Sequence, residues 1–446
     1  MFTFLKKKFY NLNWVSREFV KYNSNYSDIL RTFKSLFAKD NLGRDDLKLL
    51  LDTSKVDVNK FKNKKFVQIS TYNKICGIAT FCKSLKNGLN ELRILDKNDV
   101  LPIDINLIRN SSFAENVKYY DEISNKCYKY DYVILQHEFG FFYSTSYSLQ
   151  DNIEIFYKVV HKLSLLGHIK VLVYLHTSFF ALDLFNKNIK EATTIIDKAK
   201  KFSELNNVYF IANSLDIIND MSIFNIKVNL GIDPIKKHYK INSNTKINFK
   251  LKNNIKKQLD LSEDDIVLMM LGFINSTKRH DEMCEILALL PKNYKLLIVG
   301  GIAKGSDDIE LRKLHDKIKN LKLNNRVYIT GLFQDKDLNT YFSMAHLMCA
   351  PYTEVSSGSG SIPALLVSNK PVIAYKTKMI ESVNSQCNYR PIIEIEYDNR
   401  AKFAKKIIEL SNKNSQEYIE VCNNIKNYSS VMNDKKLAEL VLKAFG

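Results

Sequence analysis

The stretch from Cys349 to Tyr375 constrains the fold more than any other part of the sequence. It joins an apolar run, a loop of serines and glycines, an apolar helical segment and a second apolar run. Gly358 and Gly360 allow backbone angles closed to other residues, and Ser359 and Ser361 are of a type that caps helices. A helix that starts at such a loop presents unpaired N–H groups and the positive end of its dipole. The stretch predicts an anion site at a strand end; an ordinary strand-to-helix turn is the alternative.

Apolar strand-like runs alternate with helical segments in two parts of the chain, residues 62–240 and residues 241–400. In the first part the runs include 64–71, 91–96, 131–138 and 170–177, and helices are expected over 153–166 and 188–205. Alternation of this kind indicates parallel sheets covered by helices on both faces. We therefore predict an α/β fold with two Rossmann-like, doubly wound domains that face each other across a cleft.

The two ends of the chain differ from these domains. Residues 1–61 are rich in lysine and have apolar positions at helical spacing, which predicts a helical N-terminal extension. It would pack on the main body, dock a partner or touch acidic lipid headgroups. Residues 401–446 are typical of three C-terminal helices. A polar, lysine-rich connector over 236–260 would join the domains.

Composition restricts the environment and the partners. The chain of 446 residues has seven scattered cysteines and no Cys-x-x-Cys pair, which favours a reducing compartment over a disulfide framework or a zinc site. It has no apolar run of membrane-spanning length and no signal-peptide pattern. We expect a cytoplasmic protein, with peripheral contact at the inner face of the membrane left open. The formal charge of +18 favours an anionic partner, and the lack of an RNA-binding motif argues against nucleic acid.

In the first domain, polar residues and a glycine follow the predicted strands. Gly77 and Ile78 begin the helix after the first strand, where a backbone N–H can approach a diphosphate or a sugar. His137 and Glu138 end one later run and His176 ends another. Because parallel strands end at the same edge of a sheet, we expect both histidines to point toward the ligand. Structural hydrogen bonds are the alternative for each histidine.

In the second domain, Lys278 follows the first strand and can neutralise a phosphate. Gly300, at the end of another strand, would let the backbone pass near a base or ribose, and Glu354 would accept hydrogen bonds from ribose hydroxyls. Solvated side chains are the alternative for both charged residues. The Asp335–Asp337 turn fits an Asp-x-Asp metal motif but is better explained as helix capping. No metal site or covalent hydrolase motif is predicted.

Several segments, taken in order, resemble family 4 of the retaining glycosyltransferases, also described as glycosyl transferases group 1. Residues 69–85, with Cys-Gly-Ile-Ala-Thr-Phe after Ser-Thr-Tyr, are similar to the opening signature of one branch of that family. Residues 131–142 and 173–179 resemble its next signatures, and segments between 266 and 375 follow its donor domain. The resemblance covers about residues 64–385. It implies the GT-B fold and transfer of a sugar from a nucleotide-diphosphate sugar to a glycan, lipid-linked or protein acceptor.

The resemblance implies roles for Gly77, His176 and Lys278, and the other site residues are predicted from their type and their position at strand ends and loops. His176, Lys278 and Glu354 would be the catalytic residues, with His137 and Glu138 on the acceptor side. No metal or other cofactor is expected, since the donor sugar is itself the substrate. Donor binding would use Gly77, Ile78, Gly272, Lys278, Arg279, Gly300, Ser359, Gly360 and Ser361.

The sequence departs from the family pattern at three places. Phe273 stands where many members have an arginine, and Arg279 stands where glycine is usual and would supply some of the missing charge. The paired glutamates of the family are absent, so serine hydroxyls and backbone N–H groups would hold the sugar. A degenerate subunit that binds a nucleotide-sugar or a partner without turnover, or a GT-B epimerase or phosphorylase, are the alternatives.

Overall fold

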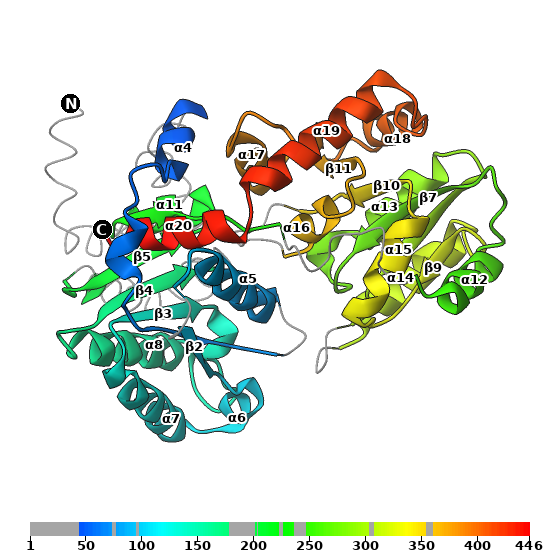
Figure 1. Ribbon diagram of the computed structural model, residues 1–446. Helices are drawn as coiled ribbons and strands as arrows, with labels where there is room; N and C mark the ends of the chain where they lie inside the picture. Colours follow the sequence, from blue (N-terminus) through cyan, green and yellow to red (C-terminus); the bar gives the residue numbers. More distant parts are fainter. Residues whose placement is uncertain are drawn as a thin grey trace, which may run out of the picture.

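The computed structural model describes residues 44–73, 77–94, 98–177, 201–202, 204–222, 226–235, 247–302, 307–353 and 360–446. They form two parallel six-stranded sheets, each flanked by helices, in two domains that lie side by side (Figure 1). This arrangement confirms the predicted α/β fold with two doubly wound domains.

The first sheet has the strand order β2-β1-β3-β4-β5-β6, and all of its pairs are parallel. Its strands are β1 (Phe66–Ser70), β2 (Asn98–Pro102), β3 (Tyr132–His137), β4 (Lys170–Leu175), β5 (Val208–Ala212) and β6 (Val228–Leu230). The helices described in this domain are α5 (Gly77–Glu91), α6 (Ile105–Asn110), α7 (Phe113–Lys126), α8 (Leu149–Ser164) and α11 (Leu215–Ser222). Short 3₁₀ turns are η1 (Val58–Phe61), η2 (Cys127–Lys129) and η3 (Phe139–Phe141).

Side chains of the first sheet alternate between two cores, as a strand period of two requires. Val67 and Ile69 pack with residues of α7 and α8 in one core. Phe66 packs with residues of α5 and of the C-terminal helix α20 (Asp434–Ala444) in the other. Helices therefore cover both faces of the sheet.

The second sheet has the order β12-β11-β10-β7-β8-β9, again parallel throughout. Its strands are β7 (Ile266–Leu271), β8 (Tyr294–Val299), β9 (Val327–Ile329), β10 (Leu347–Ala350), β11 (Val372–Tyr375) and β12 (Ile392–Ile395). Around them lie α12 (Phe249–Gln258), η5 (Ser276–Lys278), α13 (His280–Ala288), α14 (Ile309–Asn320), η6 (Asp335–Asp337), α15 (Leu338–Met344), α16 (Ser361–Leu366), α17 (Lys378–Ser385) and α18 (Arg400–Glu409).

Local structure differs from expectation over residues 91–96, where a strand is predicted. Helix α5 continues to Glu91 and closes with a turn in which the Ile94 N–H donates to the Leu89 carbonyl at 3.0 Å. Arg93 in this turn has φ of 60°, which is typical of a helix end. The strand β2 begins only at Asn98.

Parts of three other predictions lie outside the described residues. For the N-terminal extension, the structure describes α4 (Arg44–Leu51) and η1, while residues 1–43 lie outside. Most of the helix expected over 188–205 also lies outside the described ranges, as do residues 236–246 of the connector. No helix in the described part of the chain is long and apolar enough to cross a membrane.

The C-terminal tail forms three helices, α18, α19 (Gln416–Val431) and α20. Helix α20 leaves the second domain and lies against α5 and the first sheet (Figure 1). The Phe445 ring meets those of Phe66 and Tyr132 at centroid distances of 6.3 and 4.7 Å, and Lys170 Nζ donates to the Phe445 carbonyl at 3.0 Å. The end of the chain therefore ties the two domains together.

Helix α20 comes so close to α5 that a side chain at Gly88 does not fit. A Cβ on Gly88 would lie 1.9 Å from the carbonyl oxygen of Asp434. Gly88→Ala is therefore expected to lower the free energy of unfolding by about 1–3 kcal/mol, because the two helices must separate. Urea denaturation of the whole chain measures this change.

Gly77→Ala is the matched control in the same helix. A Cβ on Gly77 has no atom of the described chain within 4 Å, and alanine in a helix is favoured over glycine by roughly 0.5–1 kcal/mol. Equal stability of the Gly88→Ala and Gly77→Ala proteins would contradict the close packing of α5 and α20.

Candidate functional site

Lys278 joins the ends of two strands to the start of a helix in the second domain. Its Nζ donates to Ser361 Oγ at 2.6 Å and lies 3.7 Å from the centroid of the Tyr352 ring. The Tyr352 hydroxyl lies 3.1 Å from Ser361 Oγ and donates to the Leu271 carbonyl at 3.2 Å. The ammonium is thus placed where β7 and β10 end and α16 begins.

Burial lowers the pKa of Lys278 to about 7. Removing water penalises the ammonium form, and the hydroxyl and ring that surround it are neutral groups. A negatively charged ligand would compensate this cost and favour the charged amine. The site therefore has the electrostatic character of an anion site.

Two glycines shape the floor of this site. Gly272 has φ of +127°, which disfavours any other residue, and a Cβ there would lie 3.5 Å from Lys278 Cε. A Cβ on Gly300 would lie 1.8 Å from the Gly272 carbonyl oxygen. Gly300 is therefore required by close packing of the segments that follow β7 and β8, independently of any ligand.

The glycine turns of the two domains meet each other. Gly77 is the first residue of α5 and Gly360 immediately precedes α16. A Cβ on Gly360 would have the Gly77 Cα as its nearest neighbour, at 3.8 Å. A methyl group at Gly360 would therefore contact Gly77, so the starts of two helices, one from each domain, lie close together. Ile78 is partly buried against the core of the first domain, and Glu354 and Ser359 lie outside the described residues.

His176 lies beneath the first turns of α5. Its ring is edge-on to Phe81 with centroids 4.6 Å apart and stacks on Tyr174 at 5.1 Å. Its Nε2 is 2.8 Å from Gln136 Oε1, and only 6% of its surface is exposed. Phe81 follows Gly77 by one helical turn, so this histidine is on the side of the domain where the glycine turns meet.

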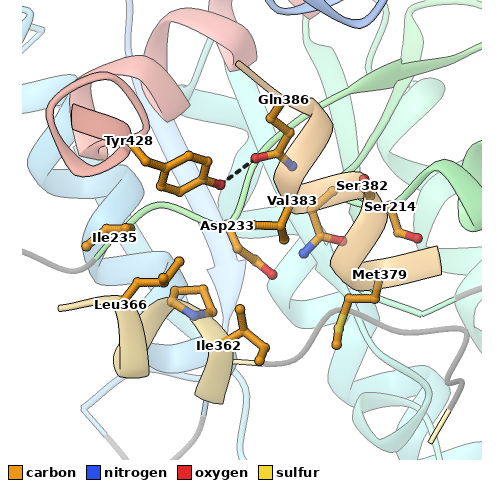
Figure 2. Close-up of a pocket in the computed structure, with 12 residues that line it drawn as sticks. Ser214, Asp233, Ile235, Ile362, Leu366, Met379, Ser382, Val383, Gln386 and Tyr428 are labelled. Carbon is orange, nitrogen blue, oxygen red and sulfur yellow. Dashed lines mark hydrogen bonds between the residues drawn. The ribbon is translucent and has the colours of Figure 1, made fainter. Parts of the chain in front are cut away.

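A cavity between the domains is a separate feature. The first domain contributes Asp233 and Ser214, and Tyr428 of α19 donates to Gln386 Oε1 at 2.7 Å (Figure 2). Met379 and Ile362 add apolar surface. Its volume of about 20 Å³ holds about one water molecule, so it is too small for a sugar.

Comparison with known proteins identifies the second domain. The family model for glycosyl transferases group 1 matches residues 252–431. The second domain is a glycosyl transferases group 1 domain. No protein of curated function matches the sequence.

Solved structures agree with the GT-B fold of this glycosyltransferase. HepE of Anabaena in complex with UDP-glucose is 15% identical with a TM-score of 0.60, over 85% of this chain and 98% of HepE. A glycosyltransferase of Rickettsia africae is 16% identical with a TM-score of 0.61, over 84% and 96% of the two chains. Sucrose-phosphate synthase of Thermosynechococcus elongatus is 12% identical with a TM-score of 0.60, over 85% and 98%.

The expectation that His137 points toward the ligand needs correction. His137 is 1% exposed and its ring packs on Phe142 and Phe156, because odd-numbered residues of β3 face the core beneath α8. Burial lowers its pKa to about 3, so the ring is neutral. Glu138 accepts from the Gly140 N–H at 2.8 Å and closes a turn. His137 therefore does not line the acceptor side, and Glu138 has a local structural partner.

Arg279 also has a different place from the one predicted. Its guanidinium pairs with Glu282 at 2.9 Å and Asp398 at 2.6 Å. Glu282 is 2% exposed and also pairs with Arg400 at 2.9 Å. The charge of Arg279 therefore compensates a buried carboxylate between α13 and α18.

The structure adds residues that the sequence analysis overlooked. Tyr352 covers the Lys278 amine, and Gln136 binds His176. Both glutamines in apolar strands, Gln68 and Gln136, were visible as polar interruptions of otherwise hydrophobic runs.

Asp337 precedes α15 but accepts from Asn248 Nδ2 at 3.2 Å instead of capping the helix. Within the described ranges, no three metal-ligating side chains cluster.

Lys278→Met is expected to change the pH dependence of stability. Below about pH 7 the amine is protonated in both states, so the folded protein bears the full cost of burying the ammonium. Above pH 7 the folded state loses this proton, while the unfolded chain keeps it up to its ordinary pKa of 10.5, so the cost decreases as the pH rises. Relative to the variant, the wild-type free energy of unfolding therefore rises between about pH 7 and pH 10, by up to about 1.4 kcal/mol per pH unit.

Urea denaturation at several pH values in this window tests the pKa of Lys278. The exposed Lys292, in the turn between α13 and β8, gives the control Lys292→Met, for which no such difference is expected. A constant difference between wild type and Lys278→Met at all pH values would rule out the lowered pKa.

Proposed function

We propose that this glycosyltransferase transfers a hexose-type sugar from a nucleotide-diphosphate sugar to a glycan, lipid-linked or protein acceptor, with retention of configuration. The observation that carries the proposal is the meeting of Gly77 and Gly360 beside the Lys278–Ser361–Tyr352 cluster. A diphosphate needs cationic and N–H partners from more than one side, and two helix starts and one amine converge at this point.

The main catalytic demand in this reaction is stabilisation of the leaving diphosphate, on which negative charge develops. Lys278 supplies a compact cation, and the first turn of α5 supplies N–H groups without an intrahelical partner. Binding of the diphosphate would restore the ammonium form of Lys278, so that charge is provided where it is needed. On this proposal the charge is neutralised by the protein, and no metal ion is required.

The proposed roles of His176 and of domain closure follow from where these parts lie in the structure. His176 would hydrogen-bond the sugar or the attacking hydroxyl, since it lies beneath the start of α5. Closure of the two domains would exclude water and prevent hydrolysis of the donor. The HepE structures contain UDP, UDP with glucose, and UDP-glucose, which makes UDP-glucose the first donor to test here. We propose His176 and Lys278 as catalytic residues, with Ser361, Gly272 and Gly360 in donor binding.

Loss of either catalytic side chain is expected to reduce activity. Lys278→Ala and His176→Ala should each lower sugar transfer, or donor hydrolysis in the absence of acceptor, at least about tenfold, because each removes a contact made in the transition state. The assay follows release of nucleoside diphosphate from a panel of nucleotide-sugars.

Lys292→Ala, which removes an exposed lysine from the turn between α13 and β8, should retain wild-type rates. Wild-type rates in the Lys278 or His176 variant would remove that residue from the mechanism. Absence of turnover with every donor, despite binding, would favour a subunit without independent activity.

Gly77→Ala separates ligand binding from folding. No atom of the described chain lies within 4 Å of the added methyl, so the variant should fold at least as stably as the wild type. In the proposed complex the methyl occupies the side of the helix start that faces the diphosphate, and UDP-glucose should bind about tenfold more weakly. Thermal shift measures both properties, since a ligand stabilises the folded state. Unchanged affinity in a stable Gly77→Ala protein would contradict a diphosphate at this turn.

A further inference from the structure

Three buried polar side chains lie in a row on one face of the first sheet. Gln68 comes from β1, Gln136 from β3, and His176 follows β4, which are neighbouring strands. Both glutamines are 0% exposed. Alternate residues of a strand point to the same face, and all three are at even-numbered positions, as Phe66 and Tyr174 are. They therefore share the face of the sheet that α5 covers.

These side chains form a continuous chain of hydrogen bonds. His176 Nε2 lies 2.8 Å from Gln136 Oε1, and Gln136 Nε2 donates to Gln68 Oε1 at 3.3 Å. Gln68 Nε2 in turn donates to the backbone carbonyl of Cys82 in α5 at 3.2 Å. The chain therefore runs from the histidine across two strands to the helix above them.

The Cys82 carbonyl at one end of this row fixes the direction of every hydrogen bond in it. A backbone carbonyl only accepts, so the NH₂ group of Gln68 must face Cys82 and its oxygen must face Gln136. The NH₂ group of Gln136 then faces Gln68, and its oxygen faces His176. An amide oxygen only accepts, so His176 Nε2 must carry a proton. When the ring is neutral, Nδ1 therefore holds the lone pair.

We propose that Gln136 and Gln68 are positioning residues that keep His176 in the Nε2–H tautomer, so that Nδ1 acts as the hydrogen-bond acceptor for a sugar hydroxyl. This inference rests on the proposed function, which supplies the hydroxyl-bearing substrate. The rings of Phe81 and Tyr174 hold the plane of the imidazole, and the two amides determine which nitrogen donates. A ring held in the opposite tautomer would present an N–H in place of the lone pair.

The tautomer can be measured without any substrate. Long-range ¹H–¹⁵N correlation spectra of the full chain labelled with ¹⁵N-histidine distinguish Nε2–H from Nδ1–H rings, and the signals missing from His176→Asn assign the residue. We expect the wild-type His176 ring to show the Nε2–H pattern. An Nδ1–H pattern would overturn the proposal whatever the enzyme does.

Variants of Gln136 test the consequence for catalysis. Gln136→Met removes the acceptor, and His176 should then populate both tautomers, with kcat lower by about ten- to a hundredfold and a smaller change in KM. Gln136→Glu keeps an acceptor for Nε2–H, and should retain the wild-type tautomer and more activity than Gln136→Met. Wild-type tautomer and kcat in Gln136→Met would overturn the proposal.

Asn116→Leu is the matched control for loss of a buried amide. Asn116 is 0% exposed in the same domain, and its Nδ2 donates to the Ile108 carbonyl at 2.9 Å, away from the row of polar residues. This variant should lose stability but keep the wild-type His176 spectrum; a changed spectrum would show that the tautomer follows general packing and would contradict the proposal. If no donor is turned over, the proposed function fails, while the wild-type spectrum still decides the tautomer.

Discussion

The contact between α5 and α20 at Gly88 is the constraint on which the first-domain half of the site depends. Since the α5 backbone touches Asp434 directly at that point, α5 has little freedom to slide along the sheet. The same helix presents Gly77 to the second domain, packs Phe81 on His176 and offers the Cys82 carbonyl to Gln68. The position of α5 thus determines both how close Gly77 comes to the second domain and how the His176 ring is held.

In the second domain, the surroundings of Lys278 are the corresponding feature of the site. There the amine donates to the Ser361 hydroxyl and lies against the Tyr352 ring, and burial lowers its pKa to about 7. The neighbouring Arg279 is neutralised by Glu282 and Asp398. These adjacent basic residues therefore differ in environment: burial lowers the pKa of Lys278, whereas hydrogen bonding and ion pairing with Asp398 and Glu282 raise the pKa of Arg279.

Hydrophobic periodicity and turn chemistry were sufficient for the fold class and for several positions of the site. Lys278 after β7, Gly77 at the start of α5 and Gly360 before α16 could be placed because strand ends and helix starts are local features. The family resemblance added their roles. The strand expected over 91–96 was wrong, because continuation of α5 and its closing turn outweighed an apolar run.

The sequence by itself determined the alternation of strands and helices, and with it the edge of each sheet where polar residues gather. Only the tertiary structure decided which of those residues lie beneath α5 and which lie beneath α8, because the packing of the helices determines what covers each face of the sheet. His137 and His176 both follow strand ends, yet one is enclosed by Phe142 and Phe156 and the other is bound by Gln136. The contacts of Lys278 with Ser361 and of Arg279 with Asp398 likewise join residues 83 and 119 positions apart, brought together by packing that no local pattern contains.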